Sequence, residues 1–207
     1  MYKFATAAVI LLLSSCFAFA GIDEGLAAYK KNDFTTAFEE FHKAADAGEV
    51  KAQNVVGYMY ANGVGVAQDE EQAVIWYRKA AEQGDVEAQM GLGFMYENGR
   101  GVAKDDKEAV AWYTKAANQG YAQSEHNLAV MYADGRGVDQ DYVKAAAWYR
   151  KAADQGIASS QYNLGIMYLK GQGVERNQNR AYAWFNKAAA QGHQGAEKAM
   201  DELLRKR

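Results

Sequence analysis

The chain repeats a segment of 36 residues four times in succession, with no insertion or deletion between the copies. The copies are residues 49–84, 85–120, 121–156 and 157–192, and twelve of their 36 columns hold a single residue type. Three of these columns are Trp76, Trp112, Trp148 and Trp184; Met59, Met95, Met131 and Met167; and Gly84, Gly120, Gly156 and Gly192. A strict period of this length predicts a solenoid, in which each copy buries its apolar face against its neighbours.

Each copy has the pattern of two helices. In residues 85–120 the apolar positions Ala88, Leu92 and Tyr96 recur at helical spacing, which predicts a first helix that stops at Asn98-Gly99. A loop with two glycines follows, and Asp105 is then placed to cap a second helix with an aromatic buried face. The predicted fold class is therefore all-α, an α/α superhelical solenoid of helix-turn-helix repeats.

The two ends of the repeat array are expected to be caps. Residues 21–48 have the pattern of a shortened helix pair, and residues 193–207 supply one last helix. In that last helix, four apolar residues are predicted to face back toward the repeats: Ala196, Met200, Leu203 and Leu204.

Residues 1–20 have the features of a secretory signal peptide. A single basic residue, Lys3, precedes an apolar run, and the segment ends in Ala18-Phe19-Ala20 before Gly21. We therefore expect a periplasmic or secreted protein. An alternative interpretation rests on Cys16, the only cysteine, because Leu13-Ser14-Ser15-Cys16 resembles a bacterial lipobox. Lipidation of Cys16 would make the chain a structural lipoprotein anchored in the outer membrane.

The composition argues against nucleic acid and against an anionic membrane surface as partners. The formal charge of −3 and the pI near 5.7 provide no basic surface for nucleic acid. Membrane contact is expected only if Cys16 is lipidated.

The sequence contains no recognisable catalytic set. The three histidines, His42, His126 and His193, fall in different parts of the repeat array without a cysteine or a recurring acidic partner. The glycine loops lack the Lys-Ser/Thr that would follow in a phosphate-binding loop. We therefore expect no enzyme activity, no catalytic residues, no metal and no cofactor.

The recurring residues of the copies are Ala-x-x-x-Leu-Gly-x-Met-Tyr, then Asn-Gly-x-Gly-Val, then Ala-x-x-Trp-Tyr-x-Lys-Ala-Ala-x-Gln-Gly. This pattern resembles the Sel-one-like repeat (SLR) family, a branch of the tetratricopeptide repeats (TPR). The resemblance implies an adaptor or scaffold for protein complexes. Cysteine-rich relatives that bind β-lactams suggest an alternative, a cell-envelope ligand-binding protein or enzyme acting on peptidoglycan or β-lactams. The absence of cysteine from the repeats of this chain argues against that alternative.

Binding specificity is expected where the copies differ in sequence but share geometry. If Ala52, Val56 and Tyr60 face the core, the opposite side of each first helix lines the concave groove of the superhelix. That strip mixes amide, imidazole and apolar side chains, which suits a protein or peptide partner, expected to be another envelope protein. The residues predicted to bind it are Asn54, Tyr58, Met90, Phe94, His126, Asn127, Val130, Tyr162, Asn163 and Ile166.

Overall fold

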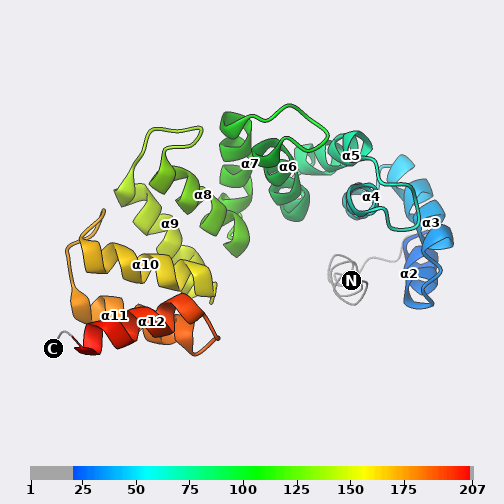
Figure 1. Ribbon diagram of the computed structural model, residues 1–207. Helices are drawn as coiled ribbons and strands as arrows, with labels where there is room; N and C mark the ends of the chain where they lie inside the picture. The colour runs from blue at the N-terminus through cyan, green and yellow to red at the C-terminus, as the bar shows by residue number, and fades with distance from the viewer. Residues whose placement is uncertain (1–20, 206–207) are drawn as a thin grey trace. The chain divides into compact units, whose positions relative to one another are not determined.

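The computed structural model describes residues 21–205, so the predicted signal peptide and Cys16 lie outside the described residues. Within the described range the chain forms eleven α-helices and no strand (Figure 1). The helices are α2 (Ile22–Lys30), α3 (Phe34–Asp46), α4 (Val50–Asn62), α5 (Glu70–Glu82), α6 (Val86–Asn98), α7 (Asp106–Asn118), α8 (Ala122–Asp134), α9 (Tyr142–Asp154), α10 (Ala158–Lys170), α11 (Gln178–Ala189) and α12 (Gln194–Arg205).

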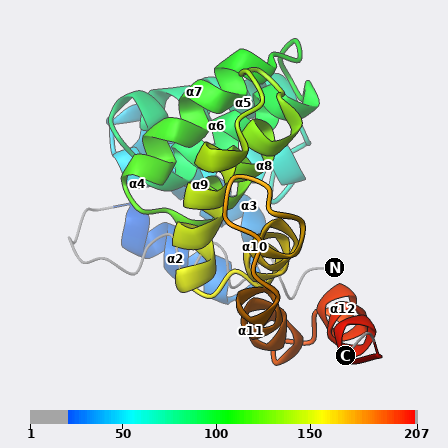
Figure 2. The same ribbon diagram turned by 90° about the vertical axis from the view of Figure 1, so that its left-hand side faces the viewer.

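The fold is all-α, a solenoid of packed helix pairs, as the repeat predicts. The first helix of each copy, called here the A helix, is α4, α6, α8 or α10, and the second, the B helix, is α5, α7, α9 or α11. The chain divides into two compact units between Asp105 and Asp106, so that α2–α6 form the N-terminal unit and α7–α12 the C-terminal unit. In each unit, helices pack against those next to them in sequence, as α10, α11 and α12 illustrate (Figure 2).

Short polar and glycine signals set the helix ends. Each A helix ends before a glycine in the left-handed conformation, and α6 stops at Asn98 with Gly99 at φ 66°, as predicted. The B helices α5, α9 and α11 begin at a side-chain cap; at α5 the Asp69 carboxylate accepts a hydrogen bond from the Gln72 amide at 2.9 Å.

The second glycine of each loop has a role that the sequence pattern did not reveal. A Cβ atom on Gly173 would lie 2.0 Å from the carbonyl oxygen of Tyr142, the first residue of α9 in the preceding copy. The same contact recurs at Gly65, Gly101 and Gly137, each against the start of the B helix or cap helix one copy earlier. The loop is therefore a packing contact between successive copies as well as a turn.

The core is formed by the predicted apolar columns. The four methionines Met59, Met95, Met131 and Met167 are buried, and the A helices approach their B helices closely at a small residue. A Cβ on Gly165 would lie 2.6 Å from a ring carbon of Phe185, which shows how tightly α10 and α11 pack.

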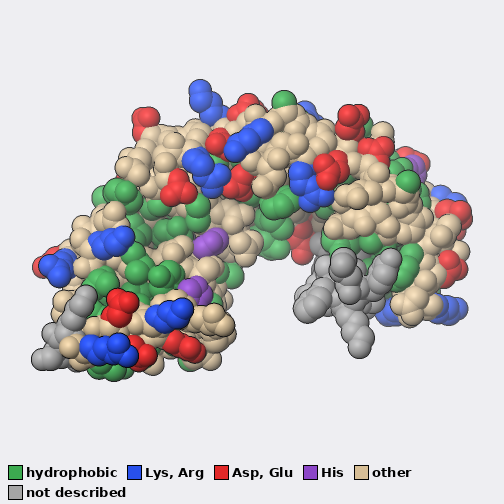
Figure 3. Space-filling view, viewed as in Figure 1, with side chains coloured by type: hydrophobic (Ala, Val, Ile, Leu, Met, Phe, Trp, Pro, Cys, Tyr) green, Lys and Arg blue, Asp and Glu red, His purple; other side chains and the backbone are tan. Residues whose placement is uncertain are grey.

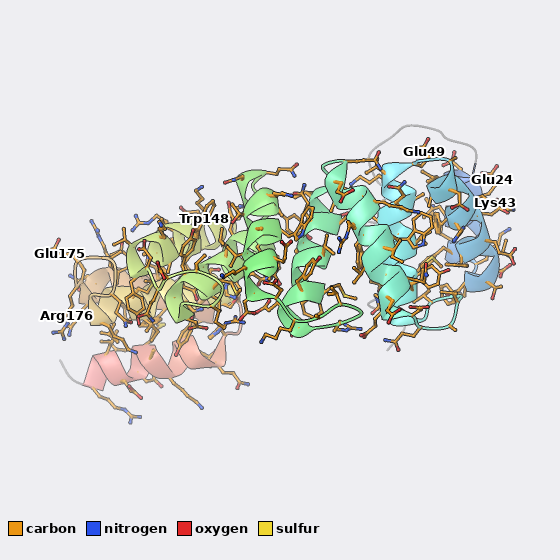
Figure 4. All side chains as sticks on the ribbon, turned by 90° about the horizontal axis from the view of Figure 1, so that it is seen from above. Glu24, Lys43, Glu49, Trp148, Glu175 and Arg176 are labelled. Atoms are coloured by element: carbon orange, nitrogen blue, oxygen red, sulfur yellow. The ribbon has the colours of Figure 1, made fainter. Side chains whose placement is uncertain are left out.

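The tryptophan column is less uniform than predicted. Trp76 and Trp112 are buried, whereas Trp148 (Figure 4) and Trp184 are half-buried. In all four copies a lysine three residues later lies over the indole, with its Nζ 3.5 to 4.1 Å from the ring centroid. These tryptophans therefore combine packing with a cation–π contact.

A ladder of buried amides joins successive copies. The Nε2 atoms of Gln53, Gln89 and Gln161 donate to carbonyl oxygens in the preceding helix at 3.2, 3.1 and 3.0 Å. The ladder changes at one position, where Glu125 replaces glutamine and is 3% exposed. A carboxylate has no proton to donate, so the ionised Glu125 cannot form this bond to the preceding helix.

The environment of Glu125 favours its protonated form. Burial raises the pKa of the Glu125 carboxyl, opposed by a hydrogen bond from Gln155 Nε2 at 2.8 Å and by the charge of Lys151. Since the folded-state pKa exceeds the unfolded value, folding stability from this group is present at low pH and is lost as pH rises through the folded-state pKa.

We predict that Glu125→Gln stabilises the protein by about 1 kcal/mol near pH 8 and much less near pH 4. The glutamine amide can donate the missing hydrogen bond to the preceding helix, and it buries no charge. Urea unfolding at both pH values measures this difference. The matched reverse variant, Gln161→Glu, should destabilise the protein mainly at high pH. Equal stability changes at the two pH values would contradict a raised pKa of Glu125 in the folded protein.

We also predict that Gly173→Ala destabilises the protein by about 3 kcal/mol, because its Cβ would clash with the backbone of α9. Gly192→Ala is the control, since Gly192 has φ 82° but a Cβ added there would meet nothing within 4 Å. Gly192→Ala should destabilise the protein by about 1 kcal/mol, because alanine is strained in the left-handed conformation. Thermal unfolding compares the two variants, and similar losses would show that the loop contact contributes little.

Candidate functional site

The described residues hold no cluster of three His, Cys, Asp or Glu side chains that could bind a metal ion. Two of the three histidines instead make local contacts: His42 Nδ1 lies 3.0 Å from Asp46 Oδ2, and His193 stacks on Tyr162 with 4.6 Å between ring centroids. Between residues 21 and 205, no helix has the length and hydropathy needed to cross a bilayer. The candidate site is the predicted strip of residues on the A helices.

In the N-terminal unit, part of the predicted strip is used for internal packing. Asn54 is 2% exposed, and its Nδ2 donates to Glu87 Oε2 at 3.3 Å. The expectation that Asn54 faces solvent is therefore wrong, because the side chain bridges α4 and α6. Tyr58 is half-buried against the core of the same unit.

Charged groups complete this bridge between α4 and α6. Lys51 Nζ lies 2.8 Å from the buried Asp85 carboxylate and 3.9 Å from Glu87. Burial raises the pKa of Glu87, and the nearby Lys51 opposes that shift. These side chains bind one another through their polar atoms, so this part of the strip is a poor candidate for binding a protein partner.

The other predicted residues of the N-terminal unit are more accessible. Met90 is half-buried, and Phe94 is 41% exposed. The Arg100 guanidinium lies 5.8 Å from the centroid of the Phe94 ring. The Phe94 ring is therefore an exposed apolar group at the surface of α6.

In the C-terminal unit, the strip remains at the surface. Three predicted residues lie on α8 (His126, Asn127 and Val130) and three on α10 (Tyr162, Asn163 and Ile166), and all six are half-buried. Figure 3 shows hydrophobic side chains gathered over α10 and its neighbours. The structure thus brings these six residues together on two neighbouring A helices.

Hydrogen bonds hold the polar members of this strip in place. His126 Nδ1 lies 2.7 Å from Ser160 Oγ across α8 and α10, and burial lowers the pKa of the imidazole, which favours its neutral form. Gln123 Nε2 donates to Asn127 Oδ1 at 3.1 Å. Burial raises the pKa of Tyr149 to about 12, while a hydrogen bond with Asn163 opposes the shift.

Two hollows adjoin the strip. A small one of about 230 Å³ is lined by Asn163 and Ile166 with Ala133, Tyr149 and other residues of α8 and α9. A larger one of about 490 Å³ lies between α10 and α12. Ile166 lines both hollows, so its side chain forms the ridge between them.

The larger hollow is lined by both apolar and charged side chains. Its apolar lining is Tyr162, Ile166, Leu169, Ala199 and Leu203. Arg176, in the loop before α11 (Figure 4), and Lys198 and Glu202 of α12 also line it. This arrangement can receive an apolar side chain while the peptide around it meets polar groups.

The contribution of α12 to this hollow was not predicted from the sequence, where the last helix was expected only to cap the array. The signal was present, because Gln194 begins α12 36 residues after Ala158 begins α10. Helix α12 therefore occupies the position of a further A helix and extends the strip through Ala199 and Leu203.

Comparison with known proteins agrees with this architecture. The family model for the Sel1 repeat matches five times, at residues 19–49, 50–85, 86–121, 122–157 and 158–193. No curated protein sequence matches the chain.

Two solved structures are similar in both sequence and fold. One is a protective antigen of uropathogenic Escherichia coli with an SLR fold, at 39% identity and a TM-score of 0.87 over 96% of this chain. This chain spans only 43% of the length of that protein. The other is a Sel1 repeat protein of Oxalobacter formigenes, at 34% identity and a TM-score of 0.83, covering 89% of this chain and 74% of that one.

A cysteine-rich relative shares only the fold. Cysteine-rich protein B of Helicobacter pylori is 24% identical with a TM-score of 0.51, covering 64% of this chain and 95% of that one. Matches to the Sel1 repeat run through most of the sequence, and two relatives above 30% identity share the fold over about nine-tenths of its length. The chain therefore belongs to the Sel1 repeat family.

Proposed function

We propose that this protein is an exported, non-catalytic scaffold that binds an extended segment of a partner protein on the A-helix strip of its C-terminal unit. Sel1 repeat proteins generally act as scaffolds for protein interactions and are generally not catalysts. The observation that carries the finer proposal is the pair of hollows on either side of Ile166.

The geometry suits an extended peptide. Successive side chains of an extended chain point to opposite sides, so residues i and i+2 face the same surface and can enter neighbouring hollows. Asn127 and Asn163 lie on the strip beside them, where amide groups can bond to the peptide backbone. Apolar side chains in the hollows would supply affinity, and the amides would fix the register.

The partner is proposed to be another protein of the cell envelope, because residues 1–20 have the composition of a cleaved signal peptide. This part of the proposal rests on the sequence alone. No bound metal or cofactor is part of it.

Peptide selection tests the strip directly. We predict that peptides selected from a random library against residues 21–207 bind the wild type and lose at least about tenfold in affinity on Ile166→Glu, since a buried charge would enter both hollows. Replacing both Asn127 and Asn163 with Ala should also weaken binding.

Val143→Glu is the matched control for this selection, because Val143 is 67% exposed on α9 and lines neither hollow. It should leave affinity unchanged. If the selected peptides bind Ile166→Glu as tightly as the wild type, the strip is not the binding site.

The export proposal has its own test. We predict that the protein isolated from its native cells begins at Gly21, because cleavage after Ala20 leaves that residue first. Mass spectrometry of the intact protein determines the N-terminus. An acylated Cys16 would instead establish the lipoprotein, and an uncleaved Met1 would contradict export through this signal.

A further inference from the structure

The imidazole of His126 is held in place by a buried hydroxyl group. His126 Nδ1 lies 2.7 Å from Ser160 Oγ, and this contact joins α8 to α10. Ser160 is 0% exposed, whereas His126 is half-buried on the strip. The imidazole also lies beside Tyr149 of α9, with 5.7 Å between the ring centroids. Contacts with α9 and α10 therefore fix the ring on the strip.

The direction of the hydrogen bond between Ser160 and His126 follows from the hydroxyl proton. A buried hydroxyl that finds no acceptor costs free energy. Among residues 21–205, the one hydrogen-bond partner of Ser160 Oγ is His126 Nδ1. The hydroxyl therefore donates to Nδ1. Burial lowers the pKa of His126 and favours the neutral ring, which has a single N–H, so its proton is on Nε2.

The equivalent positions of the other copies support this direction. Ser160 corresponds to Ala52, Ala88 and Ser124. Ser124 is also 0% exposed, and within the described part of the chain its Oγ has no hydrogen-bond partner. A serine at this position therefore finds no acceptor in its own helix. The alanines show that packing requires no hydroxyl here, so the bond to His126 is what distinguishes Ser160.

The other ring nitrogen of His126 makes no hydrogen bond to residues 21–205. The two nitrogens lie on opposite edges of the imidazole, so Nε2 is on the edge away from Ser160. Burial alone shifts the pKa of His126, which indicates that no charged side chain acts strongly on the ring. A neutral donor in these surroundings suits a neutral acceptor, because a buried carboxylate without a counter-charge is costly.

We propose that His126 Nε2–H donates a hydrogen bond to a backbone carbonyl oxygen of the partner segment, and that Ser160 is a positioning residue that keeps the proton on Nε2. This inference rests on the proposed function, because the carbonyl belongs to the extended segment on the strip. It adds the polarity of the contact: the strip donates and the partner accepts. Asn127, the next residue of α8, has the same polarity, since its Oδ1 already accepts from Gln123 Nε2 and its Nδ2 is left to donate.

Nitrogen NMR of residues 21–207 tests the position of the proton without any partner. Spectra of histidine-labelled protein near pH 8 distinguish a protonated from an unprotonated ring nitrogen, and His126→Gln identifies the signals of His126 by their loss. We predict a proton on Nε2 alone in the wild type and a mixture of both tautomers in Ser160→Ala. Ser124→Ala is the matched control and should leave the His126 signals unchanged. A proton on Nδ1 in the wild type, or no change in Ser160→Ala, would overturn the proposal.

The peptides selected against the wild type test the contact with the partner. We predict that His126→Asn weakens their binding at least about fivefold, because the asparagine amide is too short to reach the position of Nε2. His126→Gln should keep the affinity within about twofold of the wild type, because its amide nitrogen reaches that position. Ser160→Ala should weaken binding about threefold, and Ser124→Ala should not change it. Circular dichroism confirms that each variant folds.

The outcomes separate this inference from the proposed function. Peptides that lose affinity on Ile166→Glu but bind His126→Asn as tightly as the wild type would overturn the carbonyl contact and leave the strip as the binding site. Peptides that bind both variants as tightly as the wild type would overturn the strip and the contact together. The NMR spectra would then still decide the tautomer of His126.

Discussion

The structure depends on close contact between successive helices at positions that hold glycine or alanine. Gly57 and Gly165 lie directly against a ring of the following B helix, and Gly173 lies against the backbone of the preceding copy. Because each contact involves only neighbours in the chain, stability accumulates copy by copy. The described residues achieve this with buried apolar columns and a ladder of buried amides.

The same constraint decides which residues are left for recognition. Columns that hold the copies together are nearly invariant among the four copies, so variation is confined to the remaining positions. In the N-terminal unit, Lys51, Asn54 and Glu87 use that freedom to bridge α4 and α6. In the C-terminal unit, Tyr162, Asn163 and Ile166 instead line hollows at the surface. The bridging role recurs at one equivalent position, because His126, two copies after Asn54, joins α8 to α10 through Ser160.

The sequence predicted the fold well because the repeat period determines it. The end of α6 at Asn98 follows from a glycine signal, and the methionine column is buried as its invariance indicates. Single side chains were harder to place: the period alone could not show that Asn54 meets Glu87 or that Glu125 interrupts the amide ladder, because both depend on contacts between copies. The role of α12 was missed because its residues match the A-helix pattern only by position, with Asp201 in place of glycine.

The central claim is that the strip on α8 and α10 binds a protein partner. The most direct measurement places a photo-reactive residue at Asn127 in the native host, with Lys115, an exposed residue of α7 in the same unit, as the control position. We predict that crosslinking from position 127, but not from position 115, traps one envelope protein through a single segment identified by mass spectrometry. Equal capture from both positions, or none from position 127, would contradict the account.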